Sequence, residues 1–221
     1  MIVRENVIDV KNLIATENPE IEGYNEIIDR AIFFDLEHYV YRRPICIGVF
    51  GSCYYDSKIK ILKVTQYMIE NKTDAPTIVR MAKSYFEKAY NDGKNHIVTF
   101  SGNNDFTVIN YLFQRYKVPF NFDNFVKVDI QDLFKDITGI CTGLKTIEKQ
   151  FNIVRENKQI SGANLAKTFS KIMKDKDYIN RMPREKIQTI LLYNEQDVVS
   201  LFEILVNWNS FISKFKKEPP Y

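Results

Sequence analysis

Two acidic residues in an apolar segment are the first candidates for chemistry. Asp35 and Glu37 lie two positions apart in AIFFDLE, one of the most hydrophobic stretches of the chain. In a β-strand, such residues point to the same face, where their carboxylates repel each other and lose water. A divalent cation bound between them would remove both penalties. The alternative is that the strand ends at Phe34 and both acids lie in a solvated loop.

A third acid follows another strand-like segment. Asp105 comes after the turn SGNN, which follows the short apolar run His96–Phe100. Sheets of α/β proteins place their sites at the carboxyl ends of strands, so Asp105 would approach the first pair if the two strands are neighbours. Its alternative role is that of an ordinary helix N-cap.

A tyrosine and an aspartate form the last pair. Tyr193 and Asp197 lie four residues apart in LLYNEQDVVSLFEIL, a strongly apolar segment with helical spacing. They share one helix face with Ile190 and Leu201, so this face points to the protein interior. A buried Asp needs a partner from elsewhere in the fold. A salt bridge to a lysine is the plain alternative.

The elements that must position these residues follow from hydrophobic periodicity. The first 30 residues are predicted to be an irregular or partly helical lead-in, and 207–221 a C-terminal tail around a core of 31–206. Predicted strands are Ala31–Glu37, Ile45–Tyr54, Lys58–Val64, His96–Phe100 and Phe125–Asp129; predicted helices are Asp74–Tyr90, Phe106–Tyr116 and most of the chain after Asp132. The order predicts an α/β fold, in which an antiparallel meander followed by parallel strands makes a mixed five-stranded sheet flanked by helices.

Composition excludes several classes of protein. The 221 residues are 45% hydrophobic with 8 Gly and 7 Pro, which fits one globular domain and not a disordered or collagen-like chain. Charges interrupt the most apolar stretch, so a membrane span is not expected and a cytoplasmic protein is. Cys46, Cys53 and Cys141 form no CxxC pair. We expect all three to be buried hydrophobes, without disulfides or zinc.

Charge is distributed unevenly along the chain. Residues 145–186 hold 11 basic and 5 acidic residues, a net of +6, which leaves −3 for the rest of a chain whose net charge is +3. A basic segment beside an acidic remainder would suit a metal-carboxylate site next to a surface that follows phosphates. We take Lys145, Lys149 and Arg155 as the first phosphate-binding candidates. The alternative is a solvated helical face.

The acidic residues and the tyrosine together carry a family resemblance. Their order along the chain resembles the site of a DEDD-superfamily 3′→5′ exonuclease of the Tyr-containing type, which has the ribonuclease H-like fold. The residues are Asp35, Glu37, Asp105, Tyr193 and Asp197. The similarity covers roughly Ala31 to Val206 and is strongest to the YprB-like bacterial subgroup. It is carried by FFDLEH, SGNND, VDIQDLF, GLKTIEKQFNIVRE, ISGANLAKTF and YNEQDVVSLFEIL.

Two positions depart from the family pattern. The first motif usually reads D-x-E-T, and His38 stands in place of the Thr. The second motif usually has an aromatic residue before its Asp, whereas Asn104 precedes Asp105 and Phe106 follows it. The alignment at Asp105 is therefore open by about one residue.

The resemblance implies a two-metal-ion nuclease. Asp35, Glu37, Asp105 and Asp197 would hold two Mg²⁺ or Mn²⁺ ions, with Asp35 bridging, and the Tyr193 phenol would orient the attacking water. The substrate would be single-stranded DNA or RNA, with Tyr39, Tyr41 and Phe106 as possible stacking platforms, and a protein partner would supply targeting. The main alternative is a catalytically silent ribonuclease H-like module that binds nucleic acid or serves in assembly.

Overall fold

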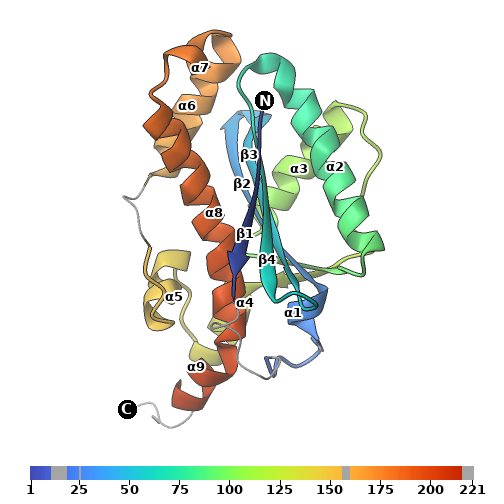
Figure 1. Ribbon diagram of the computed structural model, residues 1–221, viewed down its shortest axis with the longest axis vertical. Helices are drawn as coiled ribbons and strands as arrows, with labels where there is room; N and C mark the ends of the chain where they lie inside the picture. The colour runs from blue at the N-terminus through green and yellow to red at the C-terminus, as the bar shows by residue number, and fades with distance from the viewer. Residues whose placement is uncertain (11–18, 25, 156–159, 216–221) are drawn as a thin grey trace.

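A six-stranded mixed sheet forms the centre of the molecule in the computed structural model, which describes residues 1–10, 19–24, 26–155 and 160–215 (Figure 1). The strand order is β1-β4-β3-β2-β5-β6. The first four of these strands pair antiparallel, and β2–β5 and β5–β6 pair parallel. The strands are β1 (Ile2–Asp9), β2 (Ala31–Tyr41), β3 (Arg43–Asp56), β4 (Ile61–Met68), β5 (His96–Thr99) and β6 (Val126–Asp129).

The predicted α/β class and mixed sheet are confirmed, but the strand count was one too low. The segment expected to be an irregular lead-in contains β1, which pairs with β4 along its whole length. On its inner face, Arg4 and Asn6 contact Glu195 of the long C-terminal helix. Val3 and Val7, in contrast, are exposed. Because each face of β1 mixes polar and apolar residues, the strand lacks the period-2 apolar pattern of a half-buried strand.

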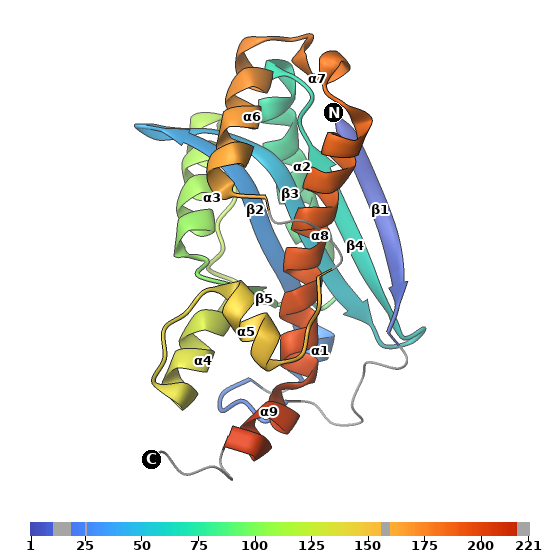
Figure 2. The ribbon, with the colours of Figure 1, turned by 90° about the vertical axis from the view of Figure 1, so that its left-hand side faces the viewer.

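Helices cover both faces of the sheet (Figures 1 and 2). α2 and α3 pack on one face, and α6 and α8 pack on the other. The helical elements are α1 (Ile27–Arg30), the 3₁₀ turn η1 (Lys72–Asp74), α2 (Ala75–Asn91), α3 (Asn103–Arg115), α4 (Ile130–Thr138), α5 (Leu144–Gln150), α6 (Gly162–Lys174), α7 (Tyr178–Arg181), α8 (Arg184–Val206) and α9 (Trp208–Phe215). None of the helices within the described ranges is both long and apolar enough to cross a membrane.

The strand β2 separates two hydrophobic cores. Phe34 packs with Phe86 of α2, whereas Phe33 packs edge-on against Phe202 of α8. All four rings are fully buried, and each contributes on the order of 2 kcal/mol of transfer free energy. Asp35 lies two residues after Phe33, so the alternation of the strand directs it toward α8.

Several predicted boundaries shift for identifiable reasons. β4 begins at Ile61, because residues 57–60 form the turn after β3. The described part of the expected C-terminal tail forms α9, whose Trp208 is buried in the core. Cys46 and Cys53 are buried free thiols, but Cys141 is exposed, so the expectation for that residue was wrong. It lies in the short loop between α4 and α5, outside the packed layers.

Candidate functional site

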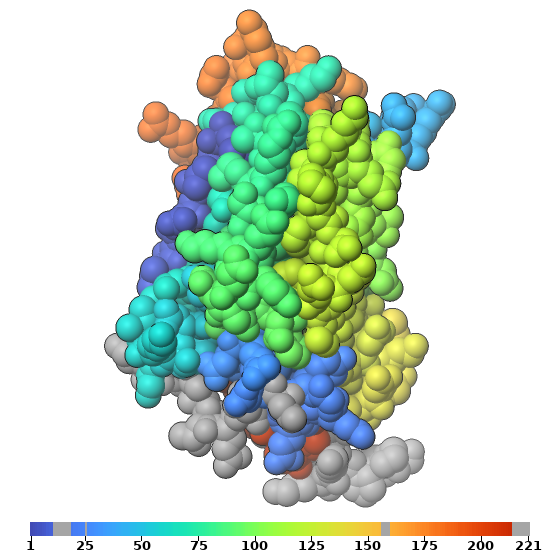
Figure 3. Space-filling view, turned by 90° about the vertical axis from the view of Figure 1, so that its right-hand side faces the viewer, coloured from blue at the N-terminus to red at the C-terminus, as the bar shows by residue number. Residues whose placement is uncertain are grey.

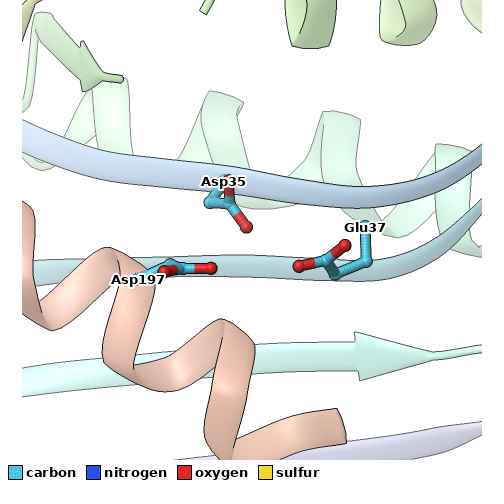
Figure 4. A group of neighbouring side chains, drawn as sticks. All are labelled: Asp35, Glu37 and Asp197. Atoms are coloured by element: carbon cyan, nitrogen blue, oxygen red, sulfur yellow. The ribbon is translucent and has the colours of Figure 1, made fainter. Parts of the chain in front are cut away.

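Three carboxylates from two elements meet beside the centre of the sheet. β2 supplies Asp35 and Glu37, and α8 supplies Asp197. One oxygen from each lies within 4.8 Å of the other two, and Figure 4 shows the three side chains directed toward one another. We call these residues the acidic cluster. Because β2 continues to Tyr41, both acids belong to the strand and not to a solvated loop.

A chain of neutral amides holds Asp35 in place. Asn194 Nδ2 donates to Asp35 Oδ2 at 2.9 Å, and Gln66 Nε2 donates to Asn194 Oδ1 at 2.8 Å. Gln66 also donates to the backbone oxygen of Leu191 at 2.8 Å, which ties β4 to α8. A Cβ on Gly51, the residue opposite Asp35 on β3, would lie 2.0 Å from Asn194 Oδ1. The close approach of α8 to the sheet therefore requires glycine at this position.

Asp105 lies next to the acidic cluster without joining its closest group. Parallel pairing of β2 with β5 brings the carboxyl end of β5 beside the cluster. Asp129 accepts hydrogen bonds from the backbone N–H groups of Ser101 and Gly102, at 2.9 Å each, and so holds the turn before α3. α3 starts at Asn103, earlier than predicted, so Asp105 is a buried residue of its first turn and not its N-cap.

The two departures from the family pattern contact each other. His38 Nε2 lies 3.2 Å from Asn104 Nδ2, and His38 Nδ1 lies 3.3 Å from the backbone oxygen of Leu36. Burial lowers the pKa of His38, and both contacts fit a neutral ring with its proton on Nδ1. That nitrogen is 3.8 Å from Asp105 Oδ1. His38 and Asn104 thus link the end of β2 to the start of α3.

Burial raises the pKa values of all four carboxyl groups, and the charges of neighbouring acids add to the shift. The pKa of Asp35 rises to about 7 through burial and the charge of Asp197. That of Glu37 rises to about 10 through burial and the charge of Asp35, and that of Asp197 to about 6 through burial. Burial, then Asp35, raises the pKa of Asp105 well above its usual range. Such a group of carboxylates favours any positive charge placed among them.

One positive charge is supplied by the chain itself. Arg155 Nη2 contacts Asp197 Oδ1 at 2.5 Å, and Arg155 Nε contacts both carboxylate oxygens of Glu148, at 2.8 and 3.0 Å. Burial acts to lower the pKa of Arg155, but Glu148 and Asp197 raise it overall. Asp197 therefore has a salt bridge, as the plain alternative held, but to an arginine. This geometry places Arg155 inside the site and not on an open phosphate-binding surface.

Two cations lie over the ring of Tyr193. Lys145 Nζ is 5.3 Å and Arg155 Cζ 5.5 Å from the ring centroid. Burial, then the charge of Asp197, raises the pKa of the phenol, so it stays protonated near neutral pH. Lys149 lies on the same helix as Lys145, α5, and is exposed. The structure thus brings Lys145 to the site and leaves Lys149 at the surface.

Four residues that support the site were not selected from the sequence. Asn194, Gln66 and Gly51 act through hydrogen bonds or close packing with residues distant in the chain, and Glu148 pairs with Arg155 seven residues later. The signals for two of them were available in outline. Asn194 begins the N-x-x-D spacing before Asp197, and Gln66 interrupts a face of β4 that is otherwise apolar.

The mixed sheet and its acidic cluster define a nuclease-like α/β protein. The family model of the RNase H superfamily matches residues 32–209, and the chain belongs to that superfamily. This membership supports a nuclease-like function and a nucleic-acid substrate. β1 lies outside the matched residues. A search of curated proteins found no matching relative.

Proposed function

We propose that the protein is a metal-dependent nuclease that shortens single-stranded nucleic acid from its 3′ end, in the manner of the Tyr-containing DEDD exonucleases of the YprB-like type. The observation that carries the proposal is the acidic cluster, in which three buried or partly buried carboxylates from β2 and α8 lie within 4.8 Å. Four such acids with raised pKa values destabilise the fold unless a cation offsets them, so their presence calls for a functional reason.

The donor set fits Mg²⁺ or Mn²⁺. Asp35, Glu37 and Asp197 offer hard carboxylate oxygens, and Asp105 lies beside them, whereas Cys46 and Cys53 are buried elsewhere in the core. Divalent ions bound here would activate a water as nucleophile and stabilise the charge on the leaving oxygen. The charge of Arg155 on Asp197 favours the anionic form of that carboxyl group, which is the form that binds metal.

Tyr193 would position the attacking water. Its raised pKa keeps the phenol protonated, so it acts as a hydrogen-bonding group and not as a base. Lys145 and Arg155 hold positive charge over its ring and beside the cluster, where negative charge develops on the phosphate during attack. We assign Lys145 to the scissile phosphate, and Arg155 to orienting Asp197 through the Glu148 pair.

A specific contact favours the alternative of a silent binding module. The guanidinium of Arg155 already sits on Asp197, and it neutralises part of the charge that a metal ion would otherwise offset. In a silent module this ion pair would be permanent, and the fold would bind strands without cutting them.

A gel assay of 5′-labelled single-stranded DNA and RNA with Mg²⁺ or Mn²⁺ distinguishes the exonuclease from the silent binding module. For the exonuclease we expect a metal-dependent ladder that shortens from the 3′ end. Asp35→Ala should abolish it, and Tyr193→Phe should slow it by about 10- to 100-fold, as expected for loss of a water-positioning group. Strands that the wild-type protein binds but leaves intact with either metal would overturn the proposal in favour of the silent module.

A further inference from the structure

The hairpin joining β2 and β3 projects beyond the helical layers. Figure 2 shows its tip extending past α3 and α6. Val40, Tyr41, Arg42 and Arg43 are all exposed there, Tyr41 to 61%. Arg42 lies 5.6 Å from the centroid of the Tyr41 ring, so a cation and an aromatic ring are presented together.

The end of α3 adds two more cations next to this tip. Arg115 Nη1 donates to the backbone oxygens of Pro44 at 3.2 Å and Ile45 at 3.4 Å, which joins the helix end to the hairpin. Lys117 follows and is exposed. Figure 3 shows the hairpin tip projecting beside α3. We call this set the basic hairpin surface: Tyr41, Arg42, Arg43, Arg115 and Lys117.

The two segments of the chain that form the basic hairpin surface contain no acidic residue. Residues 38–55 and 106–122 contain neither Asp nor Glu. Within the described residues, none of its four cations forms an ion pair. A solvated protein face usually mixes both signs of charge. Four unpaired cations beside an exposed tyrosine are therefore suited to a polyanion with planar groups.

Two of these cations lie at backbone positions that favour glycine. Arg42 has φ 58° and Lys117 has φ 53°, both in the left-handed region that favours glycine or asparagine. A long cationic side chain there costs the fold on the order of 1 kcal/mol relative to glycine. Since Lys60 elsewhere in the chain shares this conformation, its value here is practical: glycine can replace Arg42 without harm to the fold.

We propose that the basic hairpin surface binds the single-stranded substrate at a distance from the acidic cluster, through phosphates on its arginines and lysine and a base on Tyr41. The inference rests on the proposed function and extends it. β2 leads from one site to the other: Arg42, in the turn directly after this strand, lies five residues beyond Glu37, a separation of about 16 Å at about 3.3 Å per residue. A stacked strand at about 3.4 Å per nucleotide would cover that separation with about five nucleotides.

The test measures binding of fluorescein-labelled 15-nucleotide DNA and RNA by fluorescence polarisation, in EDTA and over a range of salt. Arg42→Gly with Arg43→Ala removes two charges, and the glycine relieves the left-handed strain at position 42. We expect at least about a fivefold weaker Kd at low salt and a salt slope smaller by about 1.4, since each lost phosphate contact removes about 0.7. The melting temperature should stay equal or rise.

A matched control exists at the opposite end of the sheet. Lys58 and Lys60 are exposed in the β3–β4 turn, and Lys60 has φ 56°. Lys58→Ala with Lys60→Gly removes the same charge and relieves the same strain, but should leave the Kd and the salt slope unchanged. If both double variants weakened binding equally, the net charge of the protein would explain the change in Kd, and the proposal would be overturned.

Two further measurements separate the competing explanations. If the enzyme cleaves, the hairpin variant should lose cleavage of the 15-mer but keep that of a trinucleotide, which is too short to span both sites. Competition by polyglutamate as strong as by DNA, with the same dependence on Arg42 and Arg43, would indicate an acidic protein as occupant and overturn the proposal. Because binding is measured in EDTA, hairpin-dependent binding without any cleavage would contradict the exonuclease and leave this inference standing.

Discussion

The middle of β2 and the hairpin tip that follows this strand perform opposite tasks. The middle directs Asp35 and Glu37 into a partly buried cluster of like charges, where their pKa values rise. The tip holds Arg42 and Arg43, whose side chains are exposed to solvent. Buried like charges cost folding free energy that a cation recovers, whereas exposed cations cost little. Substitutions should therefore change stability and activity in opposite directions at the cluster, and activity alone at the hairpin.

The largest effect is expected from Asp35→Asn. The amide keeps the size of the side chain and can still accept from Asn194, but it offers a metal ion no charge. Loss of several kcal/mol of metal stabilisation should lower the cleavage rate by about 10³-fold or more. Without metal at pH 8, the variant should melt a few degrees higher than the wild type, because a buried charge is gone.

Asp123→Asn is the matched control, since Asp123 is exposed and outside the cluster. It should leave both the rate and the melting temperature unchanged. An Asp35→Asn variant with reduced stability and wild-type activity would mean that the cluster is a structural feature. The proposed contrast between the acidic cluster and the hairpin tip would then be wrong.

The second prediction tests whether the position of Asn194 is needed to hold the acidic cluster. Gly51→Ala would force Asn194 away from Asp35, because the new Cβ would lie 2.0 Å from Asn194 Oδ1. We expect a loss of about 1–3 kcal/mol in unfolding free energy, as for overpacking, and reduced cleavage. Gly162→Ala is the control: at Gly162, nothing lies within 4 Å of the added Cβ. Thermal melts should show a large downward shift for the first variant and none for the second.

Much of the fold could be predicted from hydrophobic period alone. The five strands from 31 to 129 and helices α2 and α3 show regular apolar spacing, because one face of each packs against a core. β1 was missed for the opposite reason. Its inward residues include Arg4 and Asn6, which are satisfied by Glu195 of α8, and no local pattern reveals a partner 189 or more residues away.

The residues of the site also differ in how visible they are in the sequence. Carboxylates in an apolar segment are conspicuous in a sequence, so Asp35, Glu37 and Asp197 could be proposed directly and are brought together in the structure. Neutral amides such as Gln66 and Asn194 are far less conspicuous, because their value lies in hydrogen bonds to residues that only the fold brings near. Arg155 was selected for its charge, but which carboxylates it contacts could be learned only from the fold.

The third prediction concerns pH. Folded-state pKa values near 6, 7 and 10 for Asp197, Asp35 and Glu37 lie above the ordinary values near 4, so the folded state binds protons more tightly than the unfolded state. Their contribution to stability is fully present below about pH 4 and is lost as the pH rises from about 4 to about 10. The melting temperature of metal-free protein should therefore fall over that range.

Added Mn²⁺ should raise the melting temperature more at pH 8 than at pH 5, because protons compete with the metal for the same oxygens. The hairpin variant Arg42→Gly with Arg43→Ala should follow the wild-type curve. A metal-free melting temperature that rises with pH would contradict the assigned direction of these shifts.

The smallest effect distinguishes two lysines of one helix. Lys145 lies over the Tyr193 ring and lowers the pKa values of Glu37 and Asp197, whereas Lys149 is exposed one turn further along α5. Lys145→Ala should slow cleavage by about fivefold, equivalent to about 1 kcal/mol, and shift the pH–rate profile to higher pH, because the cluster then holds its protons more tightly. Lys149→Ala removes the same charge from the same helix and should change the rate by less than about twofold. If both variants slow cleavage equally and neither shifts the pH profile, the two lysines would act only as general phosphate contacts. The position of Lys145 beside the acidic cluster would then have no effect of its own on the rate.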